Sequence, residues 1–264
     1  MLSDGFADWV AEFQAEAARR GSVGDPDWPQ GADLPAPVRR SLQRFQVGED
    51  GDGRNLIGKA DEAGDHDYAV AARLFVAEEQ NHARLLARLL EAGGAPTLDG
   101  HWSDWAFVRV RRLLGLRLEL MVLMVAEFIA VAYYRAVRDG TGDPLCREVA
   151  ARILADELRH IPFHCRRLRH SVAELPAWFR PVTMAGWRVL LFAATLFVVL
   201  DHGSALRTLR TRRTGFLAEV MRASAGVVAD VLGDRARRRP PHPGQAAGTV
   251  AAPVGATGRY RGRA

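Results

Sequence analysis

The 264-residue sequence is poor in cysteine and in lysine. Its two cysteines, Cys146 and Cys165, cannot build a disulfide framework, so we expect a cytoplasmic protein. Lys59 is the single lysine among 36 basic residues, which we attribute to a coding bias rather than to a nucleic-acid partner. The first residues lack a basic stretch followed by an apolar one, so no secretory signal is predicted.

Other functional signatures are also missing from the sequence. It contains no glycine-rich phosphate loop and no Ser/His/Asp arrangement typical of hydrolases. The apolar run 189–200 has only twelve residues, whereas a helix that spans a bilayer needs ~20. We therefore predict a buried core or interface helix at this run, with membrane contact as the less favoured alternative.

The positive charge is concentrated in one segment. The formal net charge is +5, but residues 235–264 hold seven arginines and no acidic residue, which leaves residues 1–234 at −2. Segment 234–264 is also rich in proline, glycine and alanine, so we predict a disordered tail there. Because the remaining chain is not basic, no nucleic-acid partner is expected.

Helical periodicity dominates the rest of the chain, and no segment alternates with a period of two. Residues 3–20 are predicted to form a helix that has one apolar stripe and Ser3 as its N-terminal cap. The proline- and glycine-rich residues 21–37 are predicted to be a linker. Further helices are predicted at 38–62, 66–92, 104–138, 144–172, 177–204 and 214–232. The pattern predicts an all-α protein divided into units 1–37, 38–172, 173–233 and 234–264.

Two of these helices contain the motif Glu-x-x-His. The motifs are Glu79 with His82 and Glu157 with His160. Residues three apart share a helix face, so each motif presents a carboxylate and an imidazole together. Their neighbours at helical spacing are mainly apolar, which turns both pairs toward the core. Buried carboxylates need a partner, and shared divalent cations are the simplest one.

The other two helices of the unit 38–172 each offer a further glutamate in an apolar stripe. Glu49 precedes Glu79 by 30 residues, and Glu127 precedes Glu157 by the same distance. This spacing suits mid-helix positions that lie level in an antiparallel hairpin. Glu62, only 17 residues before Glu79, is too close to the turn to take the place of Glu49.

Glycines weaken the first of these helices. Each of the four glycines at positions 48, 51, 53 and 58 costs ~1 kcal/mol relative to alanine, so the helix either packs unusually closely or is broken near the site. A calcium loop starting at Asp50 is excluded. Such a loop would need glycine at position 55 and glutamate at position 61, where this sequence has Asn55 and Asp61.

These residues together resemble the ferritin-like superfamily of di-iron carboxylate four-helix bundles over about residues 38–172. The segments 45–49 and 74–86 are similar to small bacterial ferritin-like proteins. The segment 156–160 is similar to the second motif of di-iron monooxygenases and soluble fatty-acid desaturases. The resemblance implies an antiparallel four-helix bundle with an N-terminal helix and two extra C-terminal helices.

The resemblance also implies the metal ligands. Glu79 and Glu157 would bridge two metal ions, and the terminal ligands would be Glu49, Glu127, His82 and His160. Six ligands, four of them anionic and none a thiolate, suit two iron ions, with manganese or a mixed iron–manganese pair as alternatives.

Three neighbouring residues are candidates for supporting roles. Glu78 and Asp156 precede the bridging glutamates and are expected to accept the second N–H of a histidine ligand, with a solvated helix face as the alternative. His164 follows Glu157 by one heptad. It is a candidate extra ligand or proton carrier, although a packed, hydrogen-bonded histidine is favoured.

This set favours a non-haem di-iron oxidoreductase that uses O2 to oxidise a small hydrophobic substrate, with the electron donor left open. Two alternatives remain: a ferroxidase or iron-handling protein without an organic substrate, and a non-catalytic metal-binding scaffold. The added N- and C-terminal segments fit the closed shell of a storage ferritin poorly, whereas a homodimer is compatible with them.

Overall fold

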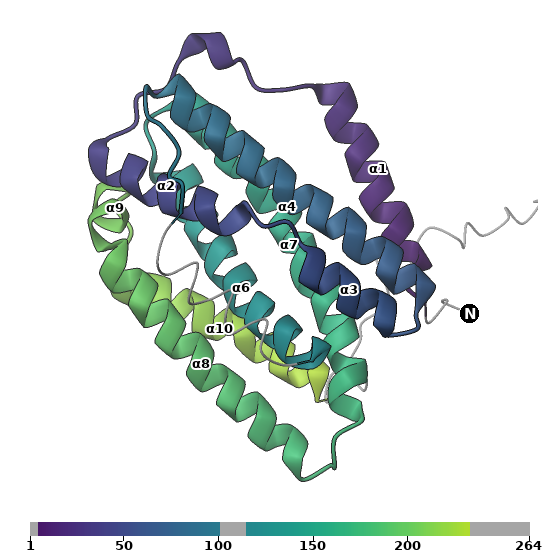
Figure 1. Ribbon diagram of the computed structural model, residues 1–264. Coiled ribbons are helices and arrows are strands. Elements are labelled where there is room, and N and C mark those ends of the chain that lie inside the picture. Colours follow the sequence, from purple (N-terminus) through teal and green to yellow (C-terminus); the bar gives the residue numbers. More distant parts are fainter. Residues whose placement is uncertain (1–4, 101–114, 233–264) are drawn as a thin grey trace, which may run out of the picture.

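The computed structural model describes residues 5–100 and 115–232, and within these ranges it is helical and contains no strand (Figure 1). The predicted all-α class is therefore confirmed. The predicted tail 234–264, the cap Ser3 and the first part of the helix expected at 104–138 lie outside the described residues.

Three long helices form the centre of the fold: α4 (His66–Ala92), α6 (Leu116–Gly140) and α7 (Pro144–Ala173). α6 and α7 are joined by a short turn and pack against each other along their length, while α4 packs on α7 and α2 (Ala36–Glu49) packs on α4. Local sequence sets two of the starts. Asp65 and Asp143 accept hydrogen bonds from the backbone N–H groups of Tyr68 and Cys146.

The helix predicted at 38–62 is broken in two. α2 ends at Glu49 and α3 (Arg54–Glu62) begins after a loop of four residues. Gly53 in this loop has a left-handed φ of 62°, and a Cβ there would lie 2.4 Å from Cγ1 of Val76. Of the two alternatives for the glycine-rich helix at 38–62, the break near the site is therefore the one that the structure confirms, and it falls directly after Glu49.

A substitution at Gly53 tests this break. We expect Gly53→Ala to lower the free energy of unfolding by about 1–3 kcal/mol, because alanine is strained at positive φ and would clash with Val76. Gly48→Ala is the matched control. It lies inside α2 with open space around its Cα, and it should stabilise the protein by about 0.5–1 kcal/mol. Equal effects in urea unfolding would contradict the role of Gly53.

A second layer covers the outer side of α6 and α7. It consists of α8 (Phe179–Asp201), the short α9 (Gly203–Thr208) and α10 (Arg213–Val231), which returns alongside α8 (Figure 1). The helix predicted at 177–204 thus ends near Asp201. On the opposite side of the molecule, α1 (Ala7–Val23) packs on α4, and the predicted linker contains a short 3-10 helix, η1 (Trp28–Gln30).

Two helices, α6 and α8, are long and apolar enough to cross a membrane. α6 is mostly buried in the bundle, as expected of a core helix. α8 is mostly exposed over its apolar window, and Val189 and Leu200 are 69% and 63% exposed. The prediction of a buried helix at 189–200 therefore holds for only one side of α8.

Candidate metal centre

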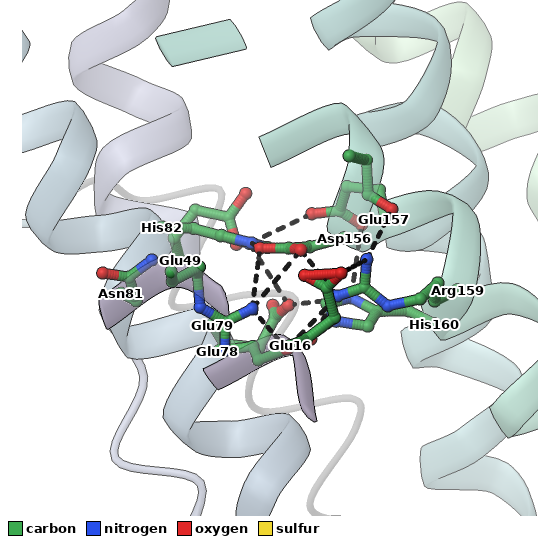
Figure 2. Close-up of polar contacts among 12 residues, drawn as sticks. Glu16, Glu49, Glu78, Glu79, Asn81, His82, Asp156, Glu157, Arg159 and His160 are labelled. Atoms are coloured by element: carbon green, nitrogen blue, oxygen red, sulfur yellow. Dashed lines mark hydrogen bonds and ion pairs between the residues drawn. The ribbon is translucent and has the colours of Figure 1, made fainter. Parts of the chain in front are cut away.

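Four helices bring the six predicted ligands together in the bundle core. α2 supplies Glu49 and α6 supplies Glu127, while α4 and α7 supply the two Glu-x-x-His motifs. Figure 2 shows the side chains of α4 and α7 facing each other across the site, joined by ion pairs and hydrogen bonds.

The ligand atoms form two overlapping groups, and within each group all of them lie within 4.8 Å of one another. One group consists of Glu49, Glu79, His82 and Glu157. The other consists of Glu79, Glu127, Glu157 and His160. Glu79 and Glu157 belong to both groups, which is the arrangement that two metal ions bridged by these carboxylates require.

Both histidines direct Nδ1 into the cluster. His82 Nδ1 lies 3.3 Å from Glu157 Oε1, and His160 Nδ1 lies 3.2 Å from Glu79 Oε1. Neither Nδ1 atom forms a hydrogen bond, and neither does Oε2 of Glu127. Buried polar atoms are normally paired, so unpaired atoms that converge on one space fit cations as their missing partners.

The Nε2 atom of each histidine contacts a carboxylate that belongs to the other motif's helix. His82 Nε2 lies 3.1 Å from Asp156 Oδ2, and His160 Nε2 lies 3.0 Å from Glu78 Oε2. Both carboxylates are buried rather than on a solvated helix face. An Nε2–H that donates to a carboxylate leaves the lone pair of Nδ1 free for a metal ion.

Two arginines neutralise these outer carboxylates. Arg20 of α1 donates to Glu78 Oε1 at 2.6 Å, and Arg159 of α7 donates to Asp156 Oδ1 at 2.6 Å. Both residues were missed by the sequence analysis. Arg159 lies inside the second motif and could have been noticed there, whereas Arg20 is 58 residues from Glu78 and carries no local signal.

Glu49 and Glu127, the glutamates predicted as terminal metal ligands, are unfavourable as anions in the metal-free protein. Burial raises the pKa of Glu49 well above its usual range, and the neighbouring charges of Glu79 and Glu157 raise it further. Burial and the charge of Glu157 raise the pKa of Glu127 in the same way. Burial and the neighbouring carboxylates thus favour the protonated form of both side chains, whereas a bound cation would favour the ionised form.

The histidines compensate part of this negative charge. Burial alone would lower the pKa of His82 and of His160, but the surrounding carboxylates raise both well above the usual value. Burial would raise the pKa of Glu157, yet its close contacts with the two histidines hold it far below its usual range. The metal-free cluster thus stores protons where the predicted site would hold metal ions.

Two further side chains border the cluster. The hydroxyl of Tyr134 donates to Glu49 Oε1 at 2.7 Å, a contact that the sequence analysis missed because Tyr134 reads as a core residue. His164 is fully buried, with Nε2 at 3.7 Å from Glu127 Oε1, and it lies outside both ligand groups. Burial lowers the pKa of His164 to about 3, so its imidazole is neutral. Neither of its ring nitrogens is hydrogen-bonded, contrary to the favoured expectation.

The contact between Asp156 and His82 can be tested by mutation. We expect Asp156→Asn to weaken metal binding by about 10–100-fold without abolishing it, because the amide orients the imidazole less strongly than the carboxylate. Asp139→Asn, at an exposed carboxylate of α6, is the control and should leave affinity unchanged. Competition titration against a chelator measures both. Equal affinity of Asp156→Asn and the unmodified chain would show that His82 is not held in this way.

No protein-family model matches the chain, and no curated protein is significantly similar to it. The described residues form a helical protein with a buried Glu/His cluster that is compatible with two metal ions.

Proposed function

We propose that this chain is a ferritin-like di-iron protein that binds two Fe(II) ions and reacts with O2 to oxidise a small hydrophobic substrate. The observation that carries the proposal is the pair of ligand groups that share Glu79 and Glu157. Four carboxylates balance the charge of two divalent ions, so a loaded site would be neutral.

The side chains around the site would control access and protonation. Bound iron would supply the redox chemistry with O2. The buried ring of Phe75 packs edge-to-face with His160 and His164 and would limit access of water from that side. Glu79 is 22% exposed and the other five ligands are buried, which favours entry of ions and O2 beside Glu79.

An open pocket at the surface of the bundle is the site that would take an organic substrate. It has a volume of about 280 Å³ and lies between α6, α7 and α10. Phe128, Leu158 and Ile161 line it, and each directly follows a predicted ligand in the sequence. Arg135 and Glu219 form an ion pair among the lining residues. An apolar pocket with few polar groups is typical of sites for small hydrophobic molecules.

Anaerobic titration with Fe(II), followed by air, tests the proposed function. We expect an endpoint of two iron ions per chain and a change in optical absorption when O2 is admitted. Sustained O2 uptake with a chemical reductant and no growing ferric deposit would support an oxidase or oxygenase. Continued oxidation of added Fe(II) into a ferric deposit would favour iron handling. Trace, substoichiometric metal would favour a scaffold and contradict the proposal.

A further inference from the structure

The outer face of α8 is apolar from end to end. Between residues 178 and 200, every exposed position carries an apolar residue, and Arg180 and Arg188 are only partly exposed. Trp178 is 73% exposed, and the other large side chains on this face include Val182, Phe192 and Leu196. We call these exposed positions the α8 outer face. A contiguous apolar surface of this extent marks an interaction site.

The inner side of α8 is firmly attached to the rest of the protein. Met184, Trp187 and Leu191 are buried, and the indole N–H of Trp187 donates to the backbone carbonyl of Met121 at 2.8 Å. α8 has 23 residues and is therefore ~34 Å long. Because one side packs on α6 and α10, α8 is placed to lie on an apolar surface rather than to cross one.

Positive charge lies at one end of the α8 outer face. At the end that leads into α10, four arginines lie within seven residues and are exposed: Arg207, Arg210, Arg212 and Arg213. α10 packs along α8 and runs back toward the end where α8 begins (Figure 1). The sequence that follows, residues 235–264, holds seven arginines and no acidic residue.

From this arrangement we infer that the α8 outer face docks on an anionic lipid bilayer. Apolar side chains would enter the boundary between headgroups and acyl chains, and the arginines would meet the lipid phosphates. A second copy of the chain fits less well. Antiparallel packing of two α8 helices would place the arginines at 207–213 of one copy beside the apolar start of the other copy's α8 outer face, and parallel packing would oppose like clusters.

Vesicle flotation of the full chain tests this inference. We expect binding to vesicles of equal parts phosphatidylcholine and phosphatidylglycerol, much weaker binding to phosphatidylcholine alone, and release at high salt. The fluorescence of Trp178 should shift to the blue and be quenched by brominated lipids, a change that Trp178→Phe removes. Absence of binding to the anionic vesicles would overturn the inference.

Paired variants separate the apolar contribution from the charge. The double change Val182→Glu with Val189→Glu should weaken vesicle binding roughly tenfold or more. Val23→Glu is the matched control: Val23 is 57% exposed on α1 and Val182 is 56% exposed on α8, so the control should bind like the unmodified chain. Arg207→Gln and Arg212→Gln should each cost roughly fivefold on anionic vesicles.

Two results would assign the α8 outer face differently. If the double valine variant bound vesicles as well as the Val23→Glu control, binding would rest on charge alone and the face would not be the docking surface. If the chain bound no vesicles but sedimented as a dimer that the double valine variant dissociates, the occupant would be a second copy. Circular dichroism of each variant establishes that the helical fold is retained.

Discussion

Replacing Glu157 with alanine is expected to abolish stoichiometric binding of two Fe(II) ions. Glu157 is the buried carboxylate shared by both ligand groups, so its loss removes an anion from each metal position at once. It also removes the contacts of its carboxylate with His82 and His160, which stay buried. Breaking such buried pairs costs about 3–5 kcal/mol, so the metal-free variant should also unfold at lower temperature.

Two companion variants keep this experiment decisive. Glu157→Gln preserves the shape of the side chain without its charge, and it should also lose stoichiometric iron if the alanine variant folds poorly. Glu148→Ala removes a partly exposed glutamate of the same helix, where it pairs with Arg152, and should bind two ions normally. Elemental analysis after anaerobic loading measures all three. Two tightly bound ions in Glu157→Gln would show that Glu157 does not bridge a metal pair.

The second large effect concerns pH. As the pH rises, we expect the free energies of unfolding of the metal-free and the metal-loaded protein to diverge. The raised pKa values of Glu49 and Glu127 contribute stability that is full below the unfolded value of about 4.3 and is lost as the pH rises through their folded values. The raised pKa values of His82 and His160 act in the same direction above about 6.5.

The outer carboxylates limit the stable range at the acid end. The pKa of Asp156 is lowered to about 2, since contacts with His82 and Arg159 outweigh its burial, and its contribution is lost as the pH falls through that value. The metal-free protein should therefore lose stability steadily as the pH rises above about 4.3. Metal ions displace the protons of the cluster, so their affinity rises with pH.

Calorimetric melting of chelator-treated and Mn(II)-loaded protein from about pH 5.5 to 8 measures this divergence. At a free ion concentration of about a hundred times Kd, loading should add about 2.7 kcal/mol to the free energy of unfolding. The difference in Tm between the two forms should widen toward pH 8. A difference that stays constant or shrinks would mean that metal does not replace the cluster's protons.

Helical periodicity and spacing were enough to predict which side chains would meet. The 30-residue intervals from Glu49 to Glu79 and from Glu127 to Glu157 follow from hairpin geometry, and the structure brings all four carboxylates together. The pairing of Glu78 and Asp156 with histidines was also expected, because these acids precede the ligands on the same helices. That each acid contacts the histidine of the other motif depends on how α4 and α7 face each other.

The sequence by itself determined the helical class and the six side chains that converge, because periodicity along one helix decides which side chains share a face. Only the tertiary structure decided three other features: the break after Glu49, the approach of Arg20 to Glu78, and the apolar side of α8 that faces outward. Each of these depends on an approach between segments that lie apart in the sequence, such as Gly53 against Val76, or on the lack of a neighbour among the described residues. Local patterns along one helix do not encode where other helices lie.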